Sequence, residues 1–88
     1  MASQPFTVSV TTSFVALPSY RCSSFSLLNS TGADLFVARA DQTEDTDKII
    51  TIPTGKPVTL VPNENCKEFA IKADAGATGV HGIAELKQ

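Results

Sequence analysis

Two short apolar runs joined by turn-forming residues constrain the fold of this chain more than any other feature. Residues 27–28 and 35–38 are apolar, and the intervening residues 29–34 read Asn-Ser-Thr-Gly-Ala-Asp. Asn and Asp side chains hydrogen-bond the nearby backbone in turns, and Gly32 adopts positive φ without steric penalty. The pattern therefore predicts a β-hairpin unit, in which a strand ending at Leu28 pairs with a second strand that follows the turn.

The same turn chemistry returns along the chain and divides it into short strands. Gly and Pro residues cluster at 53–57, and Pro and Asn residues at 62–65. The apolar patterns between such breaks predict strands within residues 6–11, 13–17, 20–28, 35–40, 48–52, 58–61, 68–72 and 80–86. Short strands separated by turns predict an all-β fold, a small antiparallel β-sandwich or barrel of seven to eight strands, rather than βαβ units.

Alternation near the N-terminus predicts where the core begins. Phe6, Val8 and Val10 alternate with polar residues and are expected to point inward. The small, polar segment 1–5 before them predicts a flexible N-terminal arm, which leaves residues 6–88 as a single β-sandwich domain. A chain of 88 residues buries only one thin core, so we expect additional burial in a homo-oligomer.

The two cysteines allow two interpretations. In the third predicted strand, Phe25 and Leu27 share one face, whereas Cys22 and Leu28 share the other. A disulfide between Cys22 and Cys66 would close a loop of about 45 residues and stabilise the fold by roughly 4 kcal/mol. Because the N-terminus lacks the basic and apolar regions of a secretion signal, we expect two free thiols in a reducing compartment.

Charge and hydropathy argue against two classes of partner. The formal net charge is −2, the sequence pI is about 5.1, and the seven Lys and Arg residues are scattered singly. Nucleic-acid binding requires a clustered basic face that neutralises phosphates, so no nucleic-acid partner is expected. No apolar run approaches the length of a membrane-spanning helix, so no membrane partner is expected either.

Residues 41–47 contain four acids and no apolar residue, which predicts an exposed loop. Asp41, Glu44, Asp45 and Asp47 could supply oxygen ligands to Ca²⁺. Their spacing lacks the turn glycine and terminal glutamate of an EF-hand loop, so a solvated loop is the preferred interpretation. We therefore expect no metal site and no cofactor.

The remaining polar motifs also have structural interpretations. The single histidine, His81, has no partner at ligand spacing and is expected to be a strand residue. Asn29-Ser30-Thr31 matches the N-glycosylation acceptor pattern, but its turn chemistry explains it without a sugar. Asp34, Arg39 and Asp41 lack an accompanying nucleophile or phosphate-binding loop. We expect no catalytic residues and no enzymatic activity.

The order of these motifs resembles that of small β-rich virion structural proteins of tailed bacteriophages. The resemblance covers about residues 25–60 and is carried by Leu28-Asn29-Ser30-Thr31-Gly32-Ala33-Asp34-Leu35, the strand with Arg39, Ile50-Thr51-Ile52-Pro53-Thr54-Gly55 and Val58-Thr59-Leu60. It implies a head-decoration or other head–tail accessory subunit that contacts a major capsid, neck or tail protein. It also implies location in the virion after assembly in the host cytoplasm, and it brings no catalytic residues.

Two kinds of contact surface remain candidates. A virion subunit would act by surface complementarity, and we expect its interface to include Phe6, Arg39, Asp41, Glu44, Asp45 and Asp47. The alternative is a small glycan- or receptor-binding β-sandwich module. Sugar-binding faces present exposed aromatic side chains, and with no Trp and one Tyr the only candidate for stacking is Tyr20.

Overall fold

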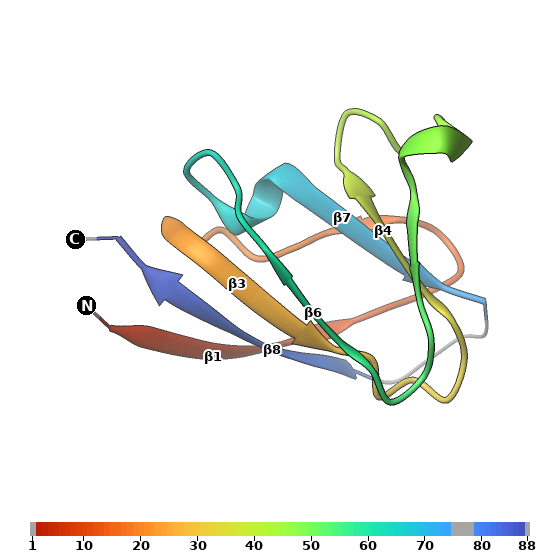
Figure 1. Ribbon diagram of the computed structural model, residues 1–88, viewed down its shortest axis with the longest axis horizontal. Coiled ribbons are helices and arrows are strands. Elements are labelled where there is room, and N and C mark those ends of the chain that lie inside the picture. Colours follow the sequence, from red (N-terminus) through yellow and green to blue (C-terminus); the bar gives the residue numbers. More distant parts are fainter. Residues whose placement is uncertain (1, 75–78, 88) are drawn as a thin grey trace.

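The computed structural model describes residues 2–74 and 79–87 and shows two four-stranded antiparallel sheets packed together (Figure 1). The first sheet has the order β1-β8-β3-β6, formed by β1 (Ser3–Ser9), β8 (Gly79–Leu86), β3 (Cys22–Leu28) and β6 (Pro57–Leu60). The second has the order β2-β7-β4-β5, formed by β2 (Val15–Ala16), β7 (Phe69–Ala73), β4 (Leu35–Arg39) and β5 (Ile50–Ile52). The predicted all-β sandwich is confirmed.

The core lies between the two sheets and receives alternate side chains from both. Phe25 and Leu27 of β3 are 1% exposed, and Leu35 and Ile71 of the second sheet are fully buried. The rings of Phe25 and Phe69 meet edge to face across the sandwich, with centroids 5.5 Å apart. Phe6 and Val10 are buried and Val8 is half-buried, so the inward face predicted for the first strand is confirmed.

The predicted hairpin between residues 28 and 35 is wrong. β3 pairs with β6 and β8, whereas β4 pairs with β5 and β7, so the two strands belong to different sheets. Residues 29–34 therefore cross from one layer of the sandwich to the other. Gly32 has φ of 82°, as the turn chemistry predicted, and Asn29 at the start of the crossing is fully buried.

The predicted N-terminal arm over residues 1–5 is wrong for Ser3, Gln4 and Pro5. These residues begin β1 and pair with β8, in a register that aligns Ser3 with Glu85. Leu86 N donates to Ala2 O at 2.8 Å, and because ladder bonds alternate, the backbone of Pro5 faces the free edge of the sheet. A missing N–H is tolerated there, which explains how a proline-containing segment forms a strand.

The predicted face of Cys22 is also wrong. The register of β3 against β8 shifts between Cys22 and Ser24, so a β-bulge interrupts the alternation of side chains. Cys22 consequently lies on the inner face with Phe25 and is fully buried. Leu28, beyond the bulge, keeps the predicted outward orientation and is 43% exposed.

Candidate interaction surface

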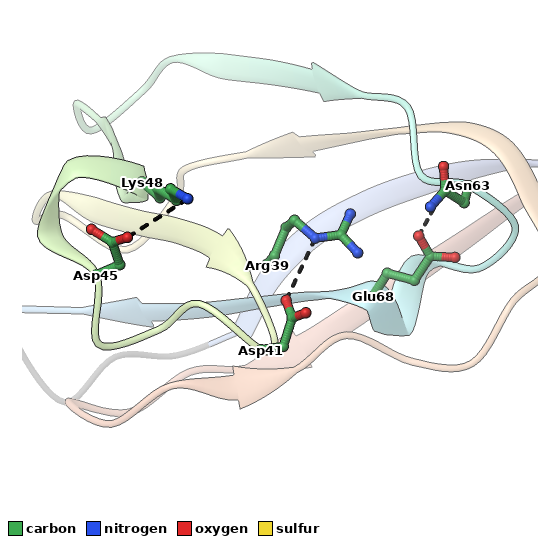
Figure 2. Close-up of polar contacts among 6 residues, drawn as sticks. All are labelled: Arg39, Asp41, Asp45, Lys48, Asn63 and Glu68. Carbon is green, nitrogen blue, oxygen red and sulfur yellow. Dashed lines mark hydrogen bonds and ion pairs between the residues drawn. The ribbon is translucent and has the colours of Figure 1, made fainter.

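The acidic segment 41–47 is an exposed loop, as predicted. Its last residues begin the short 3₁₀ helix η1 (Thr46–Lys48). Figure 2 shows two ion pairs within it: Arg39 Nε lies 3.5 Å from Asp41, and Lys48 Nζ lies 3.8 Å from Asp45. Exposed pairs of this kind contribute about 0–1 kcal/mol to stability. Two of the four acids are therefore paired locally, and Glu44 and Asp47 remain exposed on the same loop.

The carboxylates of this loop do not form a cation site. Within residues 2–74 and 79–87, no three His, Cys, Asp or Glu side chains are arranged so that they could hold a metal ion. Asp45 accepts a hydrogen bond from Asp47 N at 3.2 Å and caps η1. Its role in the fold is thus to begin a helical turn.

Phe6, which the sequence placed among the candidate interface residues, lies in the core. It is 9% exposed, and its ring packs over Gly82 of the neighbouring strand β8. Tyr20 packs against the same part of the core, with its ring centroid 6.0 Å from that of Phe6. Tyr20 is half-buried, so part of its side chain belongs to the core, and its glycan-stacking role stays a prediction.

The other polar candidates take structural positions. His81 is exposed on the outer side of β8, where Nδ1 lies 3.4 Å from Thr7 Oγ1. The amide of Asn29 is fully buried and donates to two backbone carbonyl oxygens. Asn29 Oδ1 also accepts from Thr31 N at 3.1 Å, so the turn role predicted for Asn29-Ser30-Thr31 is confirmed.

Glu68 organises a loop on the opposite side of Arg39 from the acidic segment (Figure 2). Its carboxylate accepts the backbone N–H groups of Glu64 at 2.8 Å, Asn63 at 2.8 Å and Asn65 at 2.9 Å. Hydrogen bonds to the charged form favour it, so these donors lower the pKa of Glu68 below its ordinary value. With Asn65 it forms the capping box of the 3₁₀ helix η2 (Cys66–Glu68).

The outer face of the first sheet carries almost no charge. Cross-strand pairing places on this face, which we call the β1-β8-β3-β6 outer face, the side chains of Ser3, Pro5, Thr7, Ser9, His81, Ile83, Glu85, Ser24, Ser26, Leu28, Pro57 and Thr59. Glu85 is its only acid, and it carries no lysine or arginine. The hydroxyls of Ser26 and Thr59 hydrogen-bond each other at 2.9 Å, and the hydroxyl of Ser3 donates to the carboxylate of Glu85 at 2.8 Å.

A shallow apolar hollow of about 250 Å³ lies on this outer face. Leu28, Pro57 and Ile83 line it together with His81. Leu28 is 43% exposed and Ile83 is 39% exposed, so both present aliphatic surface to solvent. This face was not among the surfaces predicted from the sequence, although the sequence carries a signal for it: the outward positions of β1 and β3 are filled by Ser and Thr rather than by charged residues.

Each free edge of the same sheet carries a proline at an outward-facing backbone position. Asn29 N donates to Lys56 O at 3.0 Å, and the alternation of ladder bonds places the backbone of Pro57 on the outer edge of β6. Pro5 occupies the equivalent position on β1. One proline on each edge removes one donor that a new strand would need, which disfavours strand pairing at these edges.

Comparison with known protein families, with characterised proteins and with solved structures gave no match to this chain. In the described part of the chain, no helix is long and apolar enough to cross a membrane.

Proposed function

We propose that this chain is a non-enzymatic structural protein of a tailed-phage virion, a head-decoration or other accessory subunit that acts through protein–protein contacts. The sequence resemblance over residues 25–60 supports the virion role. The observation that carries the contact role is the charge-poor β1-β8-β3-β6 outer face, with its apolar hollow between Leu28, Pro57 and Ile83.

The composition of this face is that of an interface centre. The cores of protein interfaces are depleted in charged residues and surrounded by a polar rim. Here the aliphatic side chains of Leu28 and Ile83 occupy the middle of the sheet, and hydroxyl side chains such as Ser3, Thr7 and Thr59 surround them. Burial of these two exposed side chains supplies the apolar contact that a small sandwich lacks on its own.

The occupant that this face fits is a second copy of the chain. In a two-fold dimer the same patch meets itself, so any charge on the patch faces its own copy nearby. A face whose only acid is Glu85 incurs little of this repulsion. The acidic segment 41–47, on the connection between β4 and β5 of the second sheet, lies outside the proposed dimer contact and is left to meet other virion proteins.

Light scattering coupled to size exclusion tests the contact. We expect wild-type protein to be a dimer or higher oligomer, and Ile83→Lys to be a folded monomer with unchanged circular dichroism. Glu44→Gln, which changes the net charge by the same amount on the exposed loop, is the control and should remain oligomeric. A monomeric wild-type protein would contradict self-association through this face.

A separate measurement tests the virion role. Antibody against the chain is used to quantify it in particles purified by density-gradient centrifugation from a lysate of the source culture. We expect the chain to sediment with particles in a fixed ratio to the main shell protein. Its complete absence from purified particles would contradict the virion role while leaving the dimer contact to be judged by light scattering.

A further inference from the structure

Two thiols that are far apart in the sequence meet in the core. Cys22 Sγ lies 2.9 Å from Cys66 Sγ, although the two residues are 44 positions apart. Both cysteines are fully buried and both are free thiols. Carbon atoms, which are smaller than sulfur, rest at about 3.5–4.0 Å when they are not bonded, so this pair is unusually close.

The backbone around the pair is fixed by hydrogen bonds on both sides. Cys22 N donates to Glu64 O at 2.9 Å, and Cys66 N donates to Tyr20 O at 3.0 Å. These bonds belong to an isolated antiparallel bridge between Arg21 and Asn65. The bulge in β3 then turns Cys22 inward, toward the start of η2 where Cys66 lies. The fold itself therefore sets the approach of the two sulfurs.

We propose that Cys22 and Cys66 are a disulfide site, which closes into an intramolecular bridge when the chain folds in the presence of a small-molecule disulfide oxidant. A disulfide bond is about 2.05 Å long, so the sulfurs have roughly 0.9 Å left to travel. The proposal rests on this juxtaposition alone and does not depend on the virion role.

The chemistry is thiol–disulfide exchange in two steps. The thiolate of one cysteine attacks a sulfur of oxidised glutathione, forming a mixed disulfide and releasing one glutathione thiolate. The thiolate of the other cysteine then attacks the protein sulfur of that mixed disulfide and releases the second glutathione. Two protein thiols lose two electrons and two protons, and one oxidised glutathione gains them as two thiols.

Burial determines when this exchange happens. Removal from water, together with the hydrogen bond that the Cys66 thiol donates to Cys22 Sγ, raises the pKa of Cys66 to about 12. The attacking species is the thiolate, so the folded, reduced protein reacts slowly and exchange proceeds in unfolded or locally opened chains. Once the oxidised chain has folded, the disulfide is buried in the core, and the surrounding packing protects it from reductants.

The test compares refolding with and without oxidant. Reduced, unfolded protein is refolded in a mixture of oxidised and reduced glutathione, then denatured, alkylated and weighed by mass spectrometry. We expect wild type with no alkylatable thiol and no disulfide between chains, whose Tm lies on the order of 10–30 °C above that of the reduced wild type, because the bridge closes a long loop. Cys22→Ala and Cys66→Ala should each keep one alkylatable thiol and show a Tm that is insensitive to reductant.

Three outcomes would overturn the proposal: two alkylatable thiols in the refolded wild type, bridges between chains instead of within one, or a bridged protein with a Tm no higher than that of the reduced form. Because reduced and oxidised wild type are compared with each other, the test stands even where an alanine variant fails to fold.

Discussion

The side-chain nitrogen of Asn29 donates to the backbone oxygen of Ile52 at 2.7 Å, and this bond ties the end of β3 in one sheet to the end of β5 in the other. The same nitrogen donates to Ala33 O at 2.8 Å. Asn29 Oδ1 accepts from the backbone N–H and the hydroxyl of Thr31, at 3.1 and 2.7 Å. An amide has two donor hydrogens and two acceptor sites, and all four are used. The side chain of Asn29 thus fixes the conformation of residues 29–34, which connect the two sheets.

We predict that Asn29→Ala lowers the free energy of unfolding by about 2–4 kcal/mol, because it removes a buried amide and its hydrogen bonds to the carbonyl oxygens of Ile52 and Ala33, of which Ala33 O keeps the bond from Thr31 Oγ1. Chemical denaturation of the reduced protein measures this change. Asn63→Ala is the matched control: Asn63 is exposed and its contact to Glu68 is made by the backbone, so its effect should stay within about 0.5 kcal/mol. Equal effects of the two substitutions would contradict the role of Asn29.

The crossing also shows where sequence reasoning reaches its limit. The side chains of Asn29 and Thr31 do form local turn hydrogen bonds, as their chemistry predicts. The same bonds serve a hairpin or a crossing equally well, and the choice between them depends on Ile52, which is distant in sequence. Strand positions and inward faces were predictable because they follow from local alternation. Pairing partners depend on long-range packing, which alternation does not encode.

The candidate surface was less predictable for a related reason. The exposed loop at residues 41–47 follows from composition, whereas the β1-β8-β3-β6 outer face exists only once four strands are ordered side by side. Phe6 looked equally suited to a core or an interface, and its burial depends on Gly82 in a strand near the other end of the chain. The contact of Cys22 with Cys66 depends on the β-bulge at Ser23, which cannot be predicted from the local sequence pattern.

Gly82 should tolerate no side chain, because the ring of Phe6 occupies the space. A Cβ at Gly82 would lie 2.5 Å from Phe6 Cζ and 2.9 Å from Ser26 O. We predict that Gly82→Ala lowers the free energy of unfolding by about 1–3 kcal/mol, as overpacked cores do. Thermal and urea denaturation of the variant measure it.

Two further variants separate this collision from a general effect of alanine in β8. Gly79→Ala meets chiefly the exposed, rotatable side chain of Thr7, so its effect should be smaller. In a Phe6→Leu background the ring atoms are gone, and Gly82→Ala should cost at least about 0.5 kcal/mol less than in wild type. Strictly additive effects of Phe6→Leu and Gly82→Ala would show that the two residues do not interact.

Glu68 should make the protein acid-sensitive. Three backbone donors, from Glu64, Asn63 and Asn65, lower its folded pKa below the ordinary value of 4.5. A lowered folded pKa means that the unfolded chain binds the proton first, so this contribution to stability is present above pH 4.5 and is lost as pH falls through the folded pKa. Urea titrations of wild type between neutral pH and pH 3 should show a declining midpoint.

The control for this pH dependence is a pair of charge-matched substitutions. Glu68→Gln removes the titrating group and should flatten the acid side of the curve, while lowering stability at neutral pH. Glu44→Gln removes an exposed carboxylate of the acidic loop and should leave the curve close to that of wild type. Identical curves for the two variants would contradict a special role of Glu68.

Cys66 should make the reduced protein lose stability at alkaline pH, the opposite end of the pH range from the effect of Glu68. Burial and the hydrogen bond that its thiol donates to Cys22 Sγ raise its pKa from 9.0 to about 12 in the folded state. Because the unfolded thiol ionises first, stability is intact below pH 9 and is lost as pH rises toward 12. Urea midpoints measured with reductant should therefore fall more steeply in wild type than in Cys66→Ala, which lacks only this thiol. Oxidised wild type has no free thiol at this position, so its alkaline slope should match that of the variant, and parallel slopes in all three forms would refute the assignment.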